Sequence, residues 1–154
     1  MTTDRRLPRG ARIVLASHNQ RKLAEFRMLL AQSGIELLSA GTLNLPEPEE
    51  TGETFAENAR IKALAAARAS GLPALADDSG FCVNALDGRP GVYSARWGGP
   101  EKDFDKAMAR VNHQIGGAED RGAAFLAVLC LDWQDGDTRW VEVRLEGDHA
   151  WPPR

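Results

Sequence analysis

The chain has 154 residues, a formal net charge of -3 and 43% hydrophobic residues, which fit one domain with a substantial core. A slightly negative net charge does not favour binding to duplex nucleic acid, which needs a basic surface. No apolar run reaches the roughly 18–20 residues that span a membrane. No apolar signal core follows the arginine-rich start, so we expect a cytoplasmic protein. We predict a loose N-terminal leader at residues 1–11 and a single domain over residues 12–154.

A strand–turn–helix unit is predicted over residues 12–32, with the strand at residues 12–16. The apolar positions of the helix fall three and four apart: Leu23, Phe26, Leu29 and Leu30. Asn19 is a good N-cap, and free N–H groups at a helix N-terminus suit a phosphate. Ser17, Asn19 and Lys22 would add donors and a positive charge there. The alternative is that Asn19 only caps the helix and Lys22 is a solvated surface lysine.

A second strand is predicted at residues 35–39, followed by an acidic loop that contains two prolines and a glycine. Runs of carboxylates are usually solvated surface. We keep that interpretation for three of the glutamates in the loop: Glu47, Glu49 and Glu53.

An alanine-rich helix is predicted to begin after Thr54, which forms a capping box with Glu57. Asn58 and Lys62 lie four residues apart and therefore share one face of this helix. That polar pair either faces a cleft or is exposed to solvent.

The central stretch of the chain is the run of residues 75–80, Leu-Ala-Asp-Asp-Ser-Gly. We expect a short buried strand at residues 73–76 that ends at Asp77 and Asp78, where Gly80 turns the backbone sharply. Carboxylates at the carboxyl end of a strand can hold a hard cation such as Mg²⁺. The alternative is an ordinary turn, because Asp, Ser and Gly are common turn residues.

Downstream, we predict a strand at residues 81–83 and a Gly- and Pro-rich loop at residues 86–99. Arg96 in this loop has the fork of donors that grips a phosphate, or it forms a surface ion pair. A helix is predicted at residues 104–115, with a buried stripe that comprises Phe104, Ala107, Met108 and Val111.

The last predicted elements are strands at residues 123–131 and 138–146, joined as a hairpin by Asp135-Gly136. Cys82 and Cys130 lack C-x-x-C spacing and lie in apolar surroundings, so we expect buried free thiols. The three histidines have no metal-ligand spacing, and neither a zinc site nor a phosphate-binding glycine loop of a known pattern is indicated.

Four motifs in order resemble the inosine triphosphate pyrophosphatase family, and the match covers most of residues 12–148. They are Ser17-His18-Asn19-x-x-Lys22, the run from Glu49 to Ala63, Ala76-Asp77-Asp78-Ser79-Gly80, and Pro90-Gly91-Val92-Tyr93-Ser94-Ala95-Arg96. The resemblance implies an α/β fold, with an elongated, mixed, twisted sheet flanked by helices and a nucleotide cleft between two lobes. It also implies a homodimer that uses Mg²⁺ and water to cut dITP, ITP or XTP into the monophosphate and pyrophosphate.

The resemblance carries site roles onto matching positions. Asp78 is implied to be the catalytic acid and a metal ligand, and Glu50 the other metal ligand. The substrate-binding residues that it implies are Ser17, His18, Asn19, Gln20, Arg21, Lys22, Lys62, Ser79 and Arg96. Lysines and a cation suit a triphosphate because they stabilise its negative charge.

Family members continue beyond the point where this chain ends, with a Gly-Phe-Gly-Tyr-Asp-Pro segment and a Ser-His-Arg segment that recognise the purine. Neither motif is found here, so we expect a C-terminally short chain. Its alternative function is a triphosphate-binding remnant without turnover. A pyrophosphatase for pyrimidine or modified nucleotides fits the motifs less well, and a haloacid-dehalogenase-type phosphatase would need Asp-x-Asp.

Overall fold

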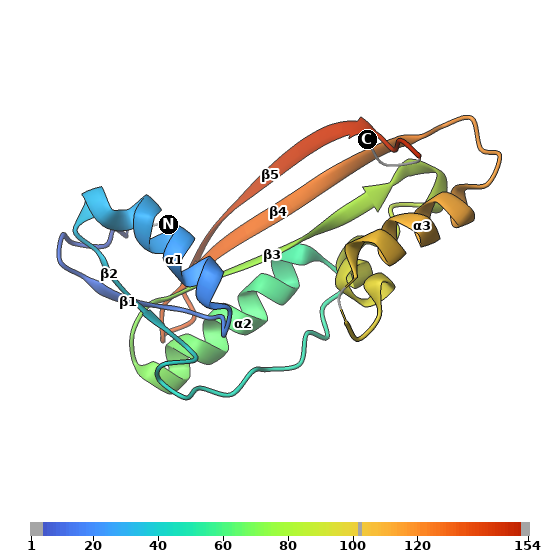
Figure 1. The fold of residues 1–154 in the computed structure, drawn as a ribbon. Coiled ribbons are helices and arrows are strands. Elements are labelled where there is room, and N and C mark those ends of the chain that lie inside the picture. Colours follow the sequence, from blue (N-terminus) through green and yellow to red (C-terminus); the bar gives the residue numbers. More distant parts are fainter. Residues whose placement is uncertain (1–4, 102, 152–154) are drawn as a thin grey trace. The chain divides into compact units, whose positions relative to one another are not determined.

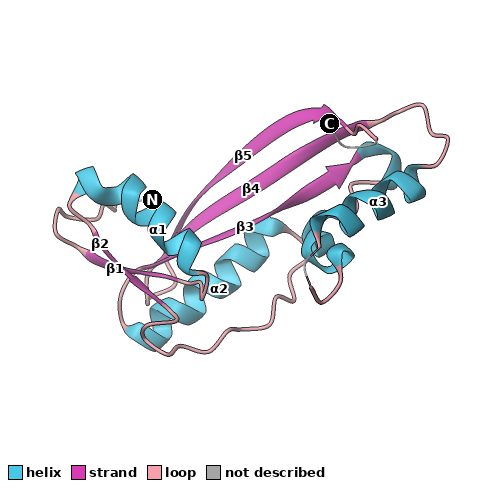
Figure 2. Ribbon diagram, in the orientation of Figure 1, coloured by secondary structure: helices cyan, strands magenta, loops and turns pink. Residues whose placement is uncertain are grey.

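The computed structural model describes residues 5–101 and 103–151 of the chain. Its strands are β1 Arg12–Leu15, β2 Glu36–Ser39, β3 Ala74–Val83, β4 Gly122–Asp132 and β5 Thr138–Asp148. Its α-helices are α1 Gln20–Leu30, α2 Phe55–Ser70 and α3 Phe104–Ile115. Three short 3-10 helices complete the elements: η1 Ala31–Ser33, η2 Asn84–Leu86 and η3 Gly91–Gly98 (Figures 1 and 2). Among the described residues, no helix is both long and apolar enough to cross a membrane.

The strands form a mixed five-stranded sheet in the order β2-β1-β3-β4-β5. β1 pairs in parallel with β2 and with the start of β3. β4 and β5 are neighbours in the sheet and are joined by a short turn, as in the predicted hairpin (Figure 2). An open mixed sheet flanked by helices confirms the predicted α/β class.

The chain divides into two compact units. The first unit contains the described residues up to 50, residues 60–76 and residues 130–139. The second contains residues 51–59, residues 77–129 and the described residues from 140 onward. The domain boundaries predicted from the sequence stay a prediction, and the two units are described separately below.

The core of the first unit joins β1, the second half of α2 and the start of β3. Its buried side chains are small: Val14, Ala40, Ala66, Ala67 and Ala74. α1 is attached to β2 by Arg27, whose guanidinium donates to the Leu37 carbonyl at 3.0 and 3.2 Å. Leu29 was expected in the buried stripe of α1, and this expectation is wrong because Leu29 is 74% exposed. Leu23, near the beginning of the helix, is buried as the stripe predicts, whereas Phe26 and Leu30 are only partly buried.

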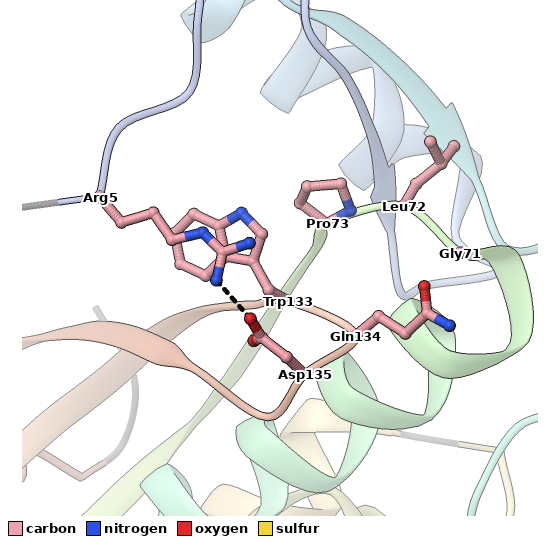
Figure 3. Close-up of a pocket in the computed structure, with 7 residues that line it drawn as sticks. All are labelled: Arg5, Gly71, Leu72, Pro73, Trp133, Gln134 and Asp135. Atoms are coloured by element: carbon pink, nitrogen blue, oxygen red, sulfur yellow. Dashed lines mark hydrogen bonds and ion pairs between the residues drawn. The ribbon is translucent and has the colours of Figure 1, made fainter. Parts of the chain in front are cut away.

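The turn of the β4–β5 hairpin closes the other end of the first unit. Trp133 and Asp137 are joined by a backbone bond of 2.9 Å, and Gly136 adopts a φ of +90°. Arg5, in the predicted leader segment, lies over the Trp133 ring at 4.4 Å and donates to Oδ2 of Asp135 at 2.8 Å (Figure 3). A pocket of about 650 Å³ lies here, and none of the predicted site residues lines it.

The second unit has its own core, built from the end of β3, α3 and the start of β4. Its buried side chains are Val83, Leu86, Val111, Ile115 and Ala123. Asp103 caps α3 by accepting from the amides of Asp105 and Lys106 at 3.0 and 3.3 Å. The predicted helix boundaries are confirmed, but Phe104 is 73% exposed and does not belong to the buried stripe. The predicted loop at residues 86–99 is largely the 3-10 helix η3.

Candidate active site

The turn between β1 and α1 is built by local hydrogen bonds. Oδ1 of Asn19 accepts from the amides of Arg21 and Lys22 at 3.0 and 3.3 Å, and the Asn19 amide donates to Oγ of Ser17 at 3.0 Å. Asn19 is therefore the N-cap that the sequence predicted. The Arg21 and Lys22 amides at the start of α1 already donate to Asn19. An anion bound at this end of the helix would therefore also need hydrogen bonds from side chains of the turn.

His18 lies at the same edge of the first unit as the turn that follows β2. A Cβ on Gly41 would be 3.6 Å from Nδ1 of His18, so the imidazole lies against that backbone. Nε2 of His18 is 3.9 Å from Oε1 of Glu47, whose side chain is 73% exposed. The carboxyl ends of the parallel strands β1 and β2 meet at this edge, which is where open α/β sheets bind ligands.

Glu50 and Lys62, two of the predicted site residues, form an ion pair. Nζ of Lys62 lies 2.8 Å from Oε1 of Glu50, and the two side chains are 20% and 42% exposed. The acidic loop before α2 therefore contributes one carboxylate to a specific contact. Lys62 lies in α2 and contacts this carboxylate, so the predicted substrate-binding lysine and the predicted metal ligand Glu50 lie side by side in the first unit.

Asn58 is neither exposed nor in an open cleft, the two alternatives that the sequence left open. It is 3% exposed, and its Oδ1 accepts from the Gly52 amide at 2.7 Å. A Cβ on Gly52 would lie 2.7 Å from this oxygen and 2.7 Å from Cβ of Glu57, so only glycine fits. Asn58 is a positioning residue that holds the backbone just after Glu50.

Thr54 and Glu57 confirm the predicted start of α2. The Glu57 amide donates to Oγ1 of Thr54 at 3.1 Å. The Glu57 carboxylate accepts from the Glu53 amide at 2.8 Å, one residue earlier than a standard capping box.

The acidic motif of β3 lies inside a strand and not at its end. β3 is continuous from Ala74 to Val83, so the expected strand end at Asp77 and the expected sharp turn at Gly80 are wrong. Because side chains alternate along a strand, Asp78 and Gly80 share one face while Asp77 and Ser79 share the other. Oδ2 of Asp78 is buried, whereas Ser79 is exposed.

Gly80 is glycine because other parts of the second unit approach the strand closely. A Cβ there would lie 2.6 Å from the Gly91 carbonyl, 2.6 Å from Oγ of Ser94 and 2.8 Å from the Phe55 ring. Oγ of Ser94 accepts from the Phe81 amide at 2.8 Å and donates to the Gly91 carbonyl at 2.6 Å. The start of η3 is thereby fixed to β3 at Gly80 and Phe81.

A pocket of about 320 Å³ borders this segment within the second unit. Ser79, Gly80 and Phe81 line it from β3, and Phe104 and Phe125 add aromatic walls. Arg96 is not among its lining residues. The Arg96 guanidinium lies 5.0 Å over the Tyr93 ring, a cation–π contact where the sequence suggested a phosphate contact or an ion pair.

Among residues 5–101 and 103–151, no group of three or more His, Cys, Asp or Glu side chains could hold a metal ion. Glu50 and Asp78 supply carboxylate oxygens, the donors that hard cations prefer. Mg²⁺ commonly takes one or two carboxylates and completes its shell with water and substrate phosphates, so each of these side chains, Glu50 in the first unit and Asp78 in the second, is a donor of the kind that such an ion uses.

Two thiols lie outside the predicted site. Cys82 and Cys130 are both free, as predicted; Cys130 is buried, but Cys82 is only partly buried, so the expectation of burial is wrong for Cys82. Burial raises the pKa of the Cys130 thiol to about 11, and burial also raises the pKa of Cys82. A thiol with a raised pKa is a poor nucleophile, so neither cysteine is a candidate for covalent catalysis.

Comparison with known proteins places these motifs in a family. The model of the Ham1 family matches residues 13–154. A dITP/XTP pyrophosphatase of Gluconobacter oxydans is 65% identical over 150 residues, which cover 97% of this chain and 72% of that protein. One from Bradyrhizobium sp. is 57% identical over 150 residues, covering 94% of this chain and 70% of that protein. The chain therefore belongs to the Ham1 family.

Solved structures agree with this assignment. A HAM1 protein from Coxiella burnetii superimposes with a TM-score of 0.83 at 39% identity, covering 94% of this chain and 75% of that one. A nucleoside-triphosphatase, or dITP/XTP pyrophosphatase, from Mycobacterium abscessus gives a TM-score of 0.77 at 41% identity, covering 89% and 73%. The resemblance predicted from the four motifs is confirmed at the level of the family.

Sequence reasoning singled out Asn58 but not its role as an acceptor for the backbone, and it assigned no role to Ser94. Asn58 and Ser94 both accept hydrogen bonds from backbone amides of glycine-containing segments. The sequence offered one signal for them, because both residues lie within the four motifs and Ser94 comes three residues after Gly91. Their function as backbone acceptors depends on contacts that only the folded chain makes.

Proposed function

We propose that this chain hydrolyses non-standard purine nucleoside triphosphates such as dITP and XTP to the monophosphate and pyrophosphate. The observation that carries the proposal is the 65% identity, over 97% of this chain, to a protein named dITP/XTP pyrophosphatase. The phosphate-binding and acidic motifs on which the sequence prediction depended lie within that matched length.

In this reaction the oxygen of water attacks a phosphorus atom, and the bond from that phosphorus to the departing pyrophosphate breaks. We assign Asp78 as the group that accepts the proton of the attacking water, because a carboxylate in β3 can act as a general base. Ser79, which is exposed beside the pocket of about 320 Å³, donates a hydrogen bond to the substrate.

The triphosphate is held by positive charge and by hydrogen-bond donors. We assign Lys62, Lys22 and Arg21 to its negative oxygens. Ser17, His18 and Asn19 in the turn, and Gln20 at the start of α1, are the other residues that we assign to the triphosphate. Glu50 keeps the Lys62 ammonium in place through their 2.8 Å ion pair. Arg96 is a weaker candidate, since its guanidinium lies over Tyr93.

Glu50 and Asp78 are proposed as the carboxylates that bind Mg²⁺. When bound, the ion neutralises charge on the phosphoryl oxygens and polarises the phosphorus for attack.

Release of pyrophosphate from dITP, dATP and dGTP with Mg²⁺ tests the proposal. Preferential release from dITP is the expected result. Release from none of the three, with dITP still binding, would instead identify a triphosphate-binding protein without turnover. Equal release from all three would retain the pyrophosphatase chemistry but remove the proposed selectivity.

Two variants test the assigned carboxylates by themselves. Asp78→Asn is expected to lower kcat by roughly 10²–10⁴-fold, the usual contribution of a general base. Glu50→Gln is expected to raise the Mg²⁺ concentration at half-maximal rate. Glu49→Gln is the matched control, because the Glu49 side chain is exposed and adjacent in sequence. A kcat for Asp78→Asn close to that of the unmodified chain would remove Asp78 from the chemistry.

A further inference from the structure

The turn between β4 and β5 holds a guanidinium group that belongs to the chain itself. The central carbon of the Arg5 guanidinium lies 4.4 Å from the centre of the Trp133 ring, and a nitrogen of the same group donates to Oδ2 of Asp135 at 2.8 Å (Figure 3). Oδ2 of Asp137 lies 3.5 Å from that nitrogen. An aromatic face together with two carboxylates suits a planar cation, which stacks on the ring and donates to the oxygens.

The two aspartates each use one carboxylate oxygen to build the turn. Oδ1 of Asp135 accepts from the Asp137 amide at 3.0 Å, and Oδ1 of Asp137 accepts from the Thr138 amide at 3.1 Å. The Arg139 guanidinium donates to the same oxygen of Asp137 at 2.9 Å. The second oxygen of each carboxylate is the one that contacts Arg5. The turn therefore positions both carboxylates by hydrogen bonds that do not involve Arg5.

The indole ring is fixed by the same turn. Trp133 is 6% exposed, and its amide donates to the Asp137 carbonyl at 2.9 Å. The Gly136 amide in turn donates to the Trp133 carbonyl at 2.9 Å. Hydrogen bonds from the Asp137 amide and then from the Arg5 guanidinium lower the pKa of Asp135, so this carboxylate is charged at neutral pH. A fixed ring and fixed charges make a preformed site, which loses little freedom when a ligand binds.

The pocket beside the ring has room for more than a guanidinium group. Its volume of about 650 Å³ falls in the range of small-molecule sites, roughly 300–1,000 Å³. Leu72 and Pro73 offer apolar contacts for an aliphatic chain, and the side-chain amide of Gln134 offers both a donor and an acceptor. The lining residues all belong to the first unit: Arg5, Gly71, Leu72, Pro73, Trp133, Gln134 and Asp135.

We propose that Trp133, Asp135 and Asp137 form a binding site for a small guanidino compound, with its guanidinium at the end of an aliphatic chain. The guanidinium of the ligand takes the position that Arg5 occupies over the indole, and the aliphatic chain extends into the pocket. Arg5 is then an internal competitor, which leaves the ring when the ligand binds. An ammonium group fits less well, because it is more strongly hydrated and has no plane to stack on the indole.

Titration of the full chain carrying Arg5→Ala with agmatine, a guanidinium on a four-carbon chain, tests the site. The indole Nε1–H resonance of Trp133, assigned by comparison with Trp133→Phe, reports binding at this ring. We expect a saturable shift that is half complete at about 10 mM agmatine, the strength of a ligand with so few atoms. Lack of a saturable shift up to about 100 mM would overturn the proposal.

The chain that retains Arg5 tests the competition. We expect it to need about threefold more agmatine or higher, because only the fraction of molecules with Arg5 away from the ring can bind. Equal half-saturation in the two chains would mean that Arg5 and the ligand occupy different places, which contradicts the proposed site. The readout is binding and not turnover, so the result does not depend on the proposed pyrophosphatase activity.

Two further ligands test which group the site selects. Cadaverine is the matched control, since an ammonium replaces the guanidinium on a chain of similar length, and we expect it to bind about fivefold more weakly or worse. Equal binding would show selection of positive charge alone and would overturn the guanidinium assignment. The tripeptide acetyl-Gly-Arg-Gly-amide brings the same group from a protein source. Binding of this peptide about tenfold tighter than agmatine would assign the site to an arginine of a protein partner and overturn the small-molecule assignment.

Asparagine variants test the carboxylates without dismantling the turn. Asp135→Asn, made in the Arg5→Ala chain, keeps an oxygen for the Asp137 amide and removes the charge. We expect it to raise the half-saturating agmatine concentration about fivefold or more. Glu25→Gln is the matched control for lost charge, because Glu25 is exposed in α1, and it should leave binding unchanged. An unchanged value for Asp135→Asn, or an equal loss in Glu25→Gln, would overturn the site.

Discussion

The β1–α1 turn and the middle of β3 carry predicted site residues of similar polarity, but they are built in different ways. In the turn, Asn19 bonds to residues two and three positions away, and its side chain is exposed. In β3, Gly80 and Phe81 are held by Ser94, thirteen residues beyond Phe81. Local bonds tolerate substitution because water replaces a lost partner, whereas a close-packed segment has no room to adjust.

Gly80→Ala is expected to have the largest effect on stability. The added Cβ would lie 2.6 Å from the Gly91 carbonyl and from Oγ of Ser94, so backbone must move. We expect a loss of about 3 kcal/mol in the free energy of unfolding, measured by urea denaturation. Gly117→Ala is the control, because no atom lies within 4 Å of a Cβ at Gly117. Equal stability of the two variants would mean that β3 is not closely packed at Gly80.

Ser94→Ala tests the same contact from the other side. It leaves the Phe81 amide without its 2.8 Å acceptor, which is expected to lower the free energy of unfolding by about 1–2 kcal/mol. Ser79→Ala is the contrast, because the exposed Ser79 is proposed to bind substrate. We expect Ser79→Ala to raise KM with little change in the denaturation midpoint. The reverse result would exchange the roles of the two serines.

Asn19→Ala probes the β1–α1 turn and is expected to lower the free energy of unfolding by about 1 kcal/mol, the usual effect of a lost N-cap. Asn19→Asp separates capping from binding. Its carboxylate still caps α1, so stability is retained, but its charge repels a triphosphate and raises KM. An unchanged KM for Asn19→Asp would place the triphosphate away from this turn.

Replacing His149 is expected to have the smallest effect on stability, and this effect appears only as the pH falls. It is 3% exposed in the second unit, and burial followed by the charge of Arg121 lowers its pKa from the ordinary value. The unfolded chain therefore binds a proton more readily, so stability is full above the unfolded pKa and falls as pH drops through the folded pKa. We expect thermal melting between pH 8 and pH 5 to show a smaller decline in His149→Gln than in the unmodified chain. His113→Gln, at an exposed site in α3, should show the original decline.

Several elements could be predicted because their signals are local. Asn19 before an apolar stripe located the start of α1, and Thr54 with Glu57 located the start of α2. Asp135-Gly136 predicted the hairpin turn, where Gly136 has the positive φ that the turn requires. The family followed from the order of four motifs, since their residues and spacing are properties of the chain alone.

Other features were decided only by tertiary structure. Asp, Ser and Gly favour a turn in isolation, yet Asp77 to Gly80 lie in a continuous strand because sheet pairing overrides local propensity. Gly52 and Gly80 are required by close contacts with Asn58 and Ser94, not by backbone angle. Leu29 and Phe104 fit apolar stripes but are exposed, since periodicity identifies a helical face and not how far the neighbouring core extends along it. The composition of a segment sets its local preferences, and contacts with distant residues determine which of those preferences the folded chain keeps.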